Sequence, residues 1–209
     1  MPGIPDHKDI QDGDSFQVTE ARPEGMAAGY DHVFLIEAER AWKRAEQAKA
    51  AKDSTGEAGA TAAAVLCAAA ACEARMSEYL AQQEDTQQLD KWFVDCVRNE
   101  RDALKQWRLL LLRRVPDFAA GTSTEYLNLG CLFQLRNVIA HRSALIRPYG
   151  EWPKQLRDCT TQNRVPADTQ GTMDWTSVAF LSKVAEWSAT TAEQWLSEMD
   201  RLGIKVSRP

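Results

Sequence analysis

The sequence predicts an all-α protein, built as a bundle of about five helices. Five separate segments place their apolar residues at helical spacing, and no segment alternates apolar and polar residues as a half-buried strand does. No internal repeat or glycine-rich phosphate loop is present. The chain has 209 residues, of which 44% are hydrophobic and 26% are charged. This length and composition suit one globular domain with a sizeable core.

The helical segments are separated by turn-forming residues and cover about 30–52, 57–83, 89–112, 124–141 and 174–202. Asp31 and Asp174 are the predicted N-caps of the first and last helices, and Gly203 is the predicted stop of the last. The third segment should break near Arg98. Residues 60–74 of the second are almost all small or apolar, so we expect that helix to be buried on most sides and to allow close helix packing. We expect the helix of residues 124–141 to lie next to it.

Two regions lack a helical pattern. Residues 1–29 contain several prolines, glycines and aspartates, and we interpret them as an N-terminal arm outside the single domain of residues 30–209. Residues 145–173 are rich in proline and glycine and are expected to form an irregular loop or flap before the last helix. The acidic start does not resemble a signal peptide. The longest apolar run, residues 62–72, is too short to span a bilayer.

Charge and cysteine content narrow the function classes. The net charge of -5 disfavours a protein that coats duplex nucleic acid. Six basic residues between Arg98 and Arg114 form either a solvated face or a local RNA track. The five cysteines lack metal-ligand spacing, so we expect them to be reduced, mostly packed, and part of a cytoplasmic protein. Three scattered histidines and no acidic cluster predict no metal site and no cofactor.

Residues 135–142, Leu-Arg-Asn-Val-Ile-Ala-His-Arg, carry the best candidates for chemistry. His141 has an ordinary pKa near ~6.5, so it can accept or release a proton near neutral pH. Arg136 stays charged and can bind two phosphate oxygens at once. Asn137 can orient the imidazole or donate to a phosphate. We predict these three as catalytic residues that act on a phosphate without metal.

Helical geometry separates the two main groups. Arg136 and His141 lie about 140° apart around a straight helix, so one helix alone cannot easily direct both at one phosphate. Either the helix ends near His141 or a second copy of the chain completes the site. One side of this helix should carry a polar strip, with a glycine that lets another backbone approach: Gly130, Gln134, Asn137 and His141. We therefore predict a homodimer whose two chains meet across this polar strip, which we call the motif face.

With its surroundings, this stretch resembles the HEPN domains, small all-helical modules of prokaryotic toxin and phage-defence systems. Their signature is an Arg, often followed by Asn, and then a His after four to six residues. Arg136-Asn137 followed by His141 matches the RN-xxx-H form. The context that also matches is an alanine-rich helix with an internal Glu, a basic aromatic helix and the residues ahead of the motif: 69–80, 105–110, Phe118, Tyr126 and Leu129.

The resemblance implies a metal-independent endoribonuclease that acts as a dimer. We expect it to cleave single-stranded or loop RNA, because in-line attack needs an unstacked, flexible backbone. Four further residues are candidate substrate contacts. Glu73 interrupts the apolar helix and is either paired in the interior or exposed in a groove. Gln134 and Arg142 lie beside the catalytic set, and Trp152 could stack on a base.

A non-catalytic interpretation stays open. Many HEPN domains serve only for dimerisation or for binding a nucleotide, an antitoxin or another defence protein. In that case His141 interacts with the last carbonyls of its helix and Arg136 forms a surface ion pair. The acidic charge of the chain favours this alternative, because an RNA-cleaving enzyme gains from a basic surface.

Overall fold

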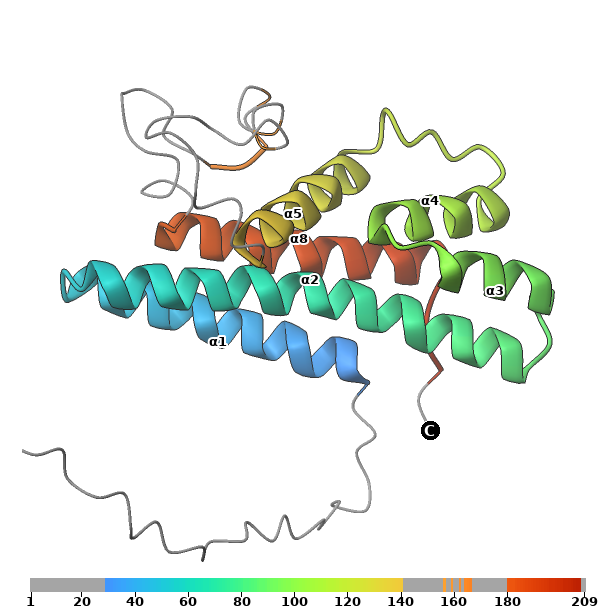
Figure 1. Ribbon diagram of the computed structural model, residues 1–209, viewed down its shortest axis with the longest axis horizontal. Coiled ribbons are helices and arrows are strands. Elements are labelled where there is room, and N and C mark those ends of the chain that lie inside the picture. Colours follow the sequence, from blue (N-terminus) through green and yellow to red (C-terminus); the bar gives the residue numbers. More distant parts are fainter. Residues whose placement is uncertain are drawn as a thin grey trace, which may run out of the picture.

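Figure 1 shows the computed structural model, which describes residues 29–140, 156, 159, 162, 164–166 and 180–207. The described residues contain helices and no strands, so the all-α prediction is confirmed. The arm 1–28 and most of the predicted irregular section 145–173 lie outside the described residues. The described helices are α1 (Tyr30–Ala50), α2 (Ser54–Asp85), α3 (Lys91–Asn99), α4 (Ala103–Arg114), α5 (Thr124–Ala140) and α8 (Ser182–Arg201).

The six described helices exceed the predicted five because the segment 89–112 forms two helices. Glu100, the residue after α3, has an extended backbone, with φ -71° and ψ 127°. Asp102 then begins the next helix, since its side chain accepts hydrogen bonds from the N–H groups of Leu104 and Lys105. The predicted break near Arg98 is therefore confirmed, and it completely separates α3 from α4.

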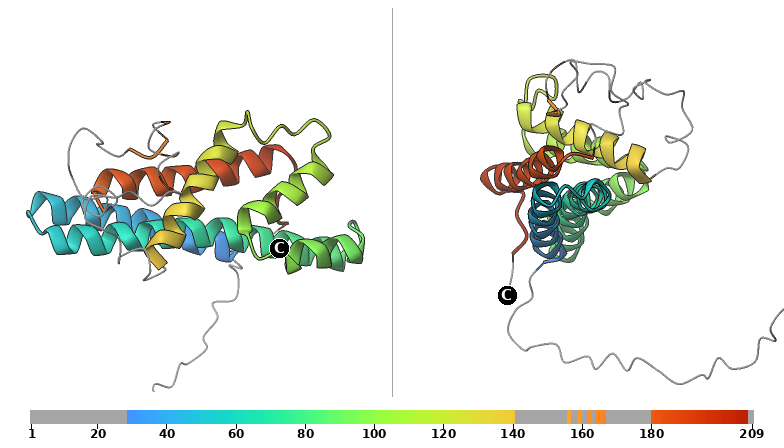
Figure 2. Two further views of the ribbon diagram at one scale, coloured as in Figure 1. Left: turned by 45° about the horizontal axis from the view of Figure 1, so that its top comes forward. Right: turned by 90° about the vertical axis from the view of Figure 1, so that its left-hand side faces the viewer.

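Helices α1 and α2 form a long antiparallel hairpin, and α8 runs beside both (Figures 1 and 2). Alanine lines the place where these three helices meet: Ala41, Ala45, Ala64 and Ala185 are almost without exposed surface. Small side chains allow the backbones to approach closely, which is why the alanine-rich segment packs in the centre. By length and composition α2 could also cross a membrane, since an 18-residue window within it has a mean hydropathy of 1.3, but core helices pass the same test.

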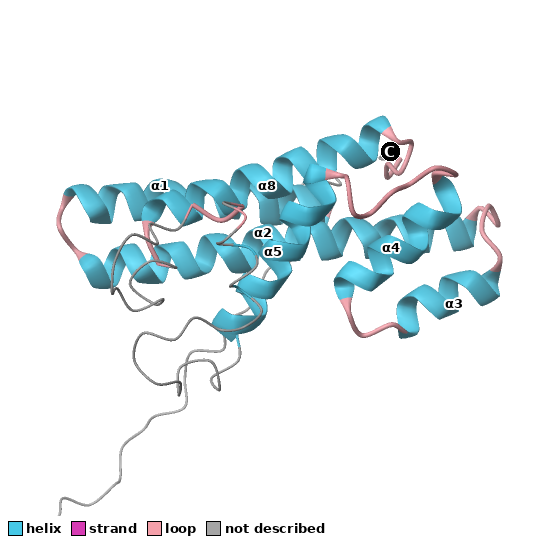
Figure 3. Cartoon of the chain, turned by 90° about the horizontal axis from the view of Figure 1, so that it is seen from above, coloured by secondary structure: helices cyan, strands magenta, loops and turns pink. Residues whose placement is uncertain are grey.

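Helix α5 crosses over α2 and α8, as seen from above in Figure 3. This contact confirms that the motif helix lies next to the alanine-rich helix. Its inward face carries Leu132, Leu135 and Val138, all buried. Helix α4 is fixed beside it through Trp107, whose ring meets that of Trp195 on α8 edge-on at 5.2 Å.

Two ion pairs made by Arg75 join both helices of the hairpin to α8. The Nε–H of Arg75 on α2 donates to Asp31 on α1 at 2.5 Å, and its Nη1 donates to Asp200 on α8 at 2.5 Å. Burial lowers the pKa of Arg75, but the hydrogen bonds and charges of Asp31 and Asp200 outweigh that effect and raise it. The prediction that Asp31 is the N-cap of the first helix is wrong, because Gly29 occupies that position.

The last helix begins later than predicted and ends as predicted. It starts at Ser182, after Leu181, so Asp174 is not its cap; Asp174 itself lies outside the described residues. At the other end Gly203 takes φ +76°. The N–H groups of Gly203 and Ile204 donate to the carbonyls of Asp200 and Met199. Ile204 is fully buried, which completes a Schellman C-cap.

Candidate functional site

Helix α5 determines where the motif side chains lie. The hydroxyl of Ser123 accepts a hydrogen bond from the N–H of Tyr126, so Ser123 caps the helix. With the apolar stripe turned toward α2 and α8, Arg136 is left at the edge of the core and Asn137 is exposed. Both side chains therefore reach solvent while their backbone is held in a packed helix.

Arg136 is held by groups from two helices. Its Nη2 forms an ion pair with Oε1 of Glu73 on α2, and its Nη1 donates to Oδ1 of Asn137 at 2.9 Å. Its Cζ lies 5.8 Å from the centre of the Phe133 ring, a cation–π distance. The side chains of Arg136 and Glu73 are 26% and 39% exposed, so the pair is at the rim of the core. The structure thus brings three predicted site residues together.

The Glu73 carboxylate pairs with Arg136 in a position where partial burial disfavours its charge. Burial raises the pKa of Glu73, and the positive charge of Arg136 offsets part of that effect. The apolar run of α2 forces this carboxylate against the core, where water solvates it poorly. Arg136 is its charged partner in the described structure, so Glu73 is paired, but its side chain is partly exposed and not in the interior.

Arg136 and Asn137 line a polar cavity of about 360 Å³ between α5 and the start of α4. Its remaining lining comes from the loop between α3 and α4 and from the first turn of α4: Glu100, Arg101, Asp102, Ala103 and Lys105, together with Phe133 of α5. Three of the lining residues are cations and two are acids. Among residues considered from the sequence, Arg101 and Lys105 belonged only to a general basic stretch, and nothing singled them out.

The structure divides that basic stretch. Three of its cations are bound to other parts of the fold. Arg98 pairs with Glu84 at 2.5 Å, Arg113 pairs with Asp90 at 3.4 Å, and Arg114 donates to Tyr79 and Gln83. The other three are exposed and have no ion-pair or hydrogen-bond partner within the described part of the chain: Arg101, Lys105 and Arg108.

Gln134 lies on a different side of α5 from Arg136. It lines a second, smaller cavity of about 180 Å³ with Gly130, Cys131 and Cys159. The structure therefore does not bring Gln134 to the Arg136 cluster. Gly130 is buried, and a Cβ built on it would lie 3.2 Å from Cδ2 of Leu104. The predicted approach of another backbone at Gly130 is wrong, because a side chain of the same chain covers it.

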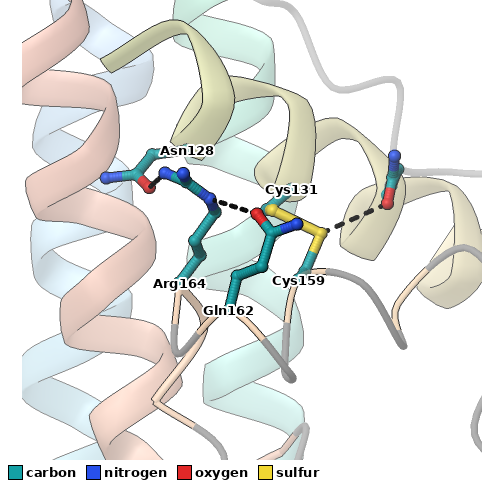
Figure 4. Close-up of a disulfide and its surroundings, with 6 residues drawn as sticks. Asn128, Cys131, Cys159, Gln162 and Arg164 are labelled. Atoms are coloured by element: carbon teal, nitrogen blue, oxygen red, sulfur yellow. Dashed lines mark hydrogen bonds between the residues drawn. A yellow bond between two sulfur atoms is a disulfide. The ribbon is translucent and has the colours of Figure 1, made fainter. Parts of the chain in front are cut away.

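Cys131 of α5 and Cys159 form a disulfide, with their Cα atoms 5.7 Å apart. Figure 4 shows this bond beside Arg164, which donates to Asn128 at 3.4 Å and to Gln162 at 2.9 Å. The prediction that all five cysteines are reduced is therefore wrong. The inference of a cytoplasmic protein loses this support, since disulfides are uncommon there. Cys67, Cys72 and Cys96 are free.

The tryptophans differ in exposure. Trp92, at the start of α3, is 74% exposed. The α3 face that turns inward carries Val94 and Val97. Trp107 and Trp195 are core residues.

The remaining site predictions lie outside the described residues: His141, which follows the described end of α5, Arg142 and Trp152. Within the described residues, no three His, Cys, Asp or Glu side chains are grouped in a way that could hold a metal ion. Comparison of the chain with protein-family models, with curated proteins and with solved structures found no match.

Proposed function

We propose that this chain is a metal-independent endoribonuclease of the HEPN type, a toxin or phage-defence effector that cleaves single-stranded or loop RNA. The observation that carries the proposal is the arrangement of Arg136. Its guanidinium is oriented by Glu73 and Asn137 at the edge of a polar cavity. It lies five positions before His141 in the sequence. A fixed cation beside a solvent-filled cavity is what a phosphate-binding site requires.

The proposed reaction is an internal transfer at phosphorus. The ribose 2′-oxygen loses its proton to one His141 imidazole and forms a bond to phosphorus. The bond from phosphorus to the 5′-oxygen breaks, and a second protonated imidazole gives that oxygen a proton. The products are a 2′,3′-cyclic phosphate and a 5′-hydroxyl end. Arg136 stabilises the added negative charge on the phosphoryl oxygens. DNA is not a substrate, because it lacks the 2′-hydroxyl.

The second imidazole would come from a second copy of the chain, as the resemblance implies. The 140° separation of Arg136 and His141 on a straight helix supports this assembly. Gly130 no longer does, because Leu104 covers it. Light scattering on the purified protein at micromolar concentration should give twice the monomer mass of 23.4 kDa.

The deciding experiment compares four proteins on total RNA in EDTA: wild type, His141→Ala, Arg136→Lys and Arg40→Ala as the control. Arg40 is an exposed cation on α1 that pairs with Glu37 on the same helix. Wild type and the control should cleave at equal rates. His141→Ala and Arg136→Lys should lose on the order of a hundredfold, because one removes the proton transfer and the other removes the bidentate fork. Equal cleavage by all four, or cleavage only after metal is added, overturns the proposal.

One observation favours a non-catalytic module instead. The guanidinium of Arg136 already has an acidic partner in Glu73, and this pair joins α2 to α5 as a structural ion pair would. On this alternative, the cavity binds a nucleotide or a protein partner and His141 does no chemistry. Full RNA integrity after incubation with wild type, combined with tight binding of one partner, would establish it.

A further inference from the structure

The structure sorts six neighbouring cations into two groups with different roles. The three that are engaged stabilise helix contacts, through Glu84, Asp90 and the Tyr79–Gln83 pair. The three that are not engaged follow one another from the loop before α4 into its second turn: Arg101, Lys105 and Arg108. Lys105 and Arg108 are three positions apart and therefore share a helix face. A row of exposed cations without an acidic partner among the described residues is unexpected on a chain with net charge -5.

The row begins in the candidate site. Arg101 and Lys105 line the same cavity as Arg136 and Asn137, so cations face it from both α4 and α5. At the other end, the positive charge of Arg108 acts on Tyr126, near the start of α5. The row of cations therefore runs along α5, from Arg136 toward the N-terminal end of that helix.

The two acidic side chains that line the cavity, Glu100 and Asp102, do not form ion pairs with these cations. Oδ1 of Asp102 accepts hydrogen bonds from the N–H groups of Leu104 and Lys105, so this carboxylate caps α4. Oε1 of Glu100 accepts from the N–H of Asp102 at 3.1 Å. Both carboxylates thus bind backbone, and the side chains of Arg101 and Lys105 stay free to meet an anion.

We propose that Arg101, Lys105 and Arg108 bind the backbone phosphates of single-stranded RNA on one side of the phosphate held by Arg136. This inference rests on the proposed function and extends it to a substrate track. Three successive cations beside a groove match a flexible chain of phosphates, each carrying one charge. The acidic remainder of the chain repels a long polyanion, which limits the footprint to a few nucleotides.

The test separates binding from cleavage. A fluorescent 2′-O-methyl RNA of about twelve nucleotides cannot form a cyclic phosphate, so its anisotropy reports binding alone. The test variant is Arg101→Ala/Lys105→Ala, with Arg108→Ala as a second variant. The matched control is Arg40→Ala/Lys43→Ala, which removes two exposed cations from α1 and changes the net charge equally.

The double variant should bind on the order of tenfold more weakly or worse, since hydrogen bonds to charged groups are lost. Its affinity should also depend less on salt, with a logarithmic slope lower by about 1.4 for two phosphate contacts. Arg108→Ala should show a smaller loss of the same kind, and the control should bind as wild type does. Equal weakening in test and control, or no binding by wild type in low salt, overturns the track.

Cleavage of ordinary RNA by the same proteins distinguishes the two proposals. If wild type cleaves and the double variant binds as tightly as wild type, the track is wrong and the ribonuclease proposal stands. If wild type leaves RNA intact while binding still depends on Arg101 and Lys105, the ribonuclease proposal is wrong and the track stands. Circular dichroism of the two test variants should match that of wild type, because these exposed side chains form no ion pair or hydrogen bond with the residues that the structure describes.

Discussion

Glu73 on α2 and Arg136 on α5, 63 positions apart in the chain, form an ion pair at the edge of the core. The pair leaves part of the guanidinium open, since Nη2 meets Glu73 and Nη1 meets Asn137. A phosphate could still approach the remaining N–H groups of the fork. Glu73 is therefore a positioning residue in the proposed ribonuclease, acting through the orientation of Arg136.

Two substitutions at Glu73 distinguish the effect of its hydrogen bond to Arg136 from the effect of its negative charge. Glu73→Gln keeps an oxygen that accepts from Arg136, so most of the cleavage rate should remain. Glu73→Ala removes the acceptor, so the guanidinium can rotate, and kcat should fall on the order of tenfold or more. Initial rates at saturating RNA measure the difference. Equal losses in both variants would show that the negative charge of Glu73 matters and its hydrogen bond does not.

The Asp31–Arg75–Asp200 network supports a prediction about stability. Arg75 and Asp31 have side chains only 8% and 1% exposed, whereas Asp200 is 51% exposed. Arg75→Ala removes a buried guanidinium that pairs with both Asp31 and Asp200, so the free energy of unfolding should fall by about 3–5 kcal/mol. Asp200→Ala removes a partly solvated partner and should cost about 1 kcal/mol or less. Urea unfolding measures both, and similar losses in the two variants would contradict this division.

Helical periodicity predicted the features that depend on local sequence. The alanine-rich helix, the motif helix from Thr124, the break after Arg98 and the stop at Gly203 all follow from spacing and capping. These features need only the residues within a few turns of one another. The neighbour relation of α2 and α5 also followed, because each presents an apolar face that must be covered.

Pairings between distant residues could not be predicted in this way. Asp31 looks like a cap because aspartate favours that position, yet its partner Arg75 lies 44 positions later. Likewise, the cysteine pattern gave no sign that Cys131 and Cys159 would meet. Spacing indicates which face of a helix points inward, but not which side chain of another helix it meets there. Arg101 and Lys105 escaped notice for the same reason.

Gly130→Ala tests the packing of α5. Alanine is favoured over glycine inside a helix by roughly 1 kcal/mol, and the new Cβ would press on Leu104 at 3.2 Å. Leu104 lines the cavity of about 180 Å³, so it can move aside. We expect a stability gain of roughly 0.5–1 kcal/mol in thermal or urea unfolding, with the oligomeric state unchanged. A weakened dimer would show instead that a second chain packs against Gly130.

The number of reactive thiols can be predicted without any assumption about function. In the folded protein only Cys96 is exposed, while Cys72 is buried and burial strongly raises the pKa of its thiol. Burial also raises the pKa of Cys67, which makes it a poor nucleophile. Cys131 and Cys159 are joined. A thiol reagent should therefore modify one cysteine quickly in the native protein and three after denaturation without reductant.

Reduction should then expose all five cysteines and destabilise the fold. The disulfide closes a loop across 28 positions, and loop entropy of that size corresponds to about 3–4 kcal/mol. Cys159→Ser should lower the free energy of unfolding by a comparable amount, whereas Cys96→Ser, the exposed control, should leave it unchanged. Five reactive thiols in the unreduced, denatured protein would contradict the pairing of Cys131 with Cys159. That result would also restore the cysteine argument for a cytoplasmic protein.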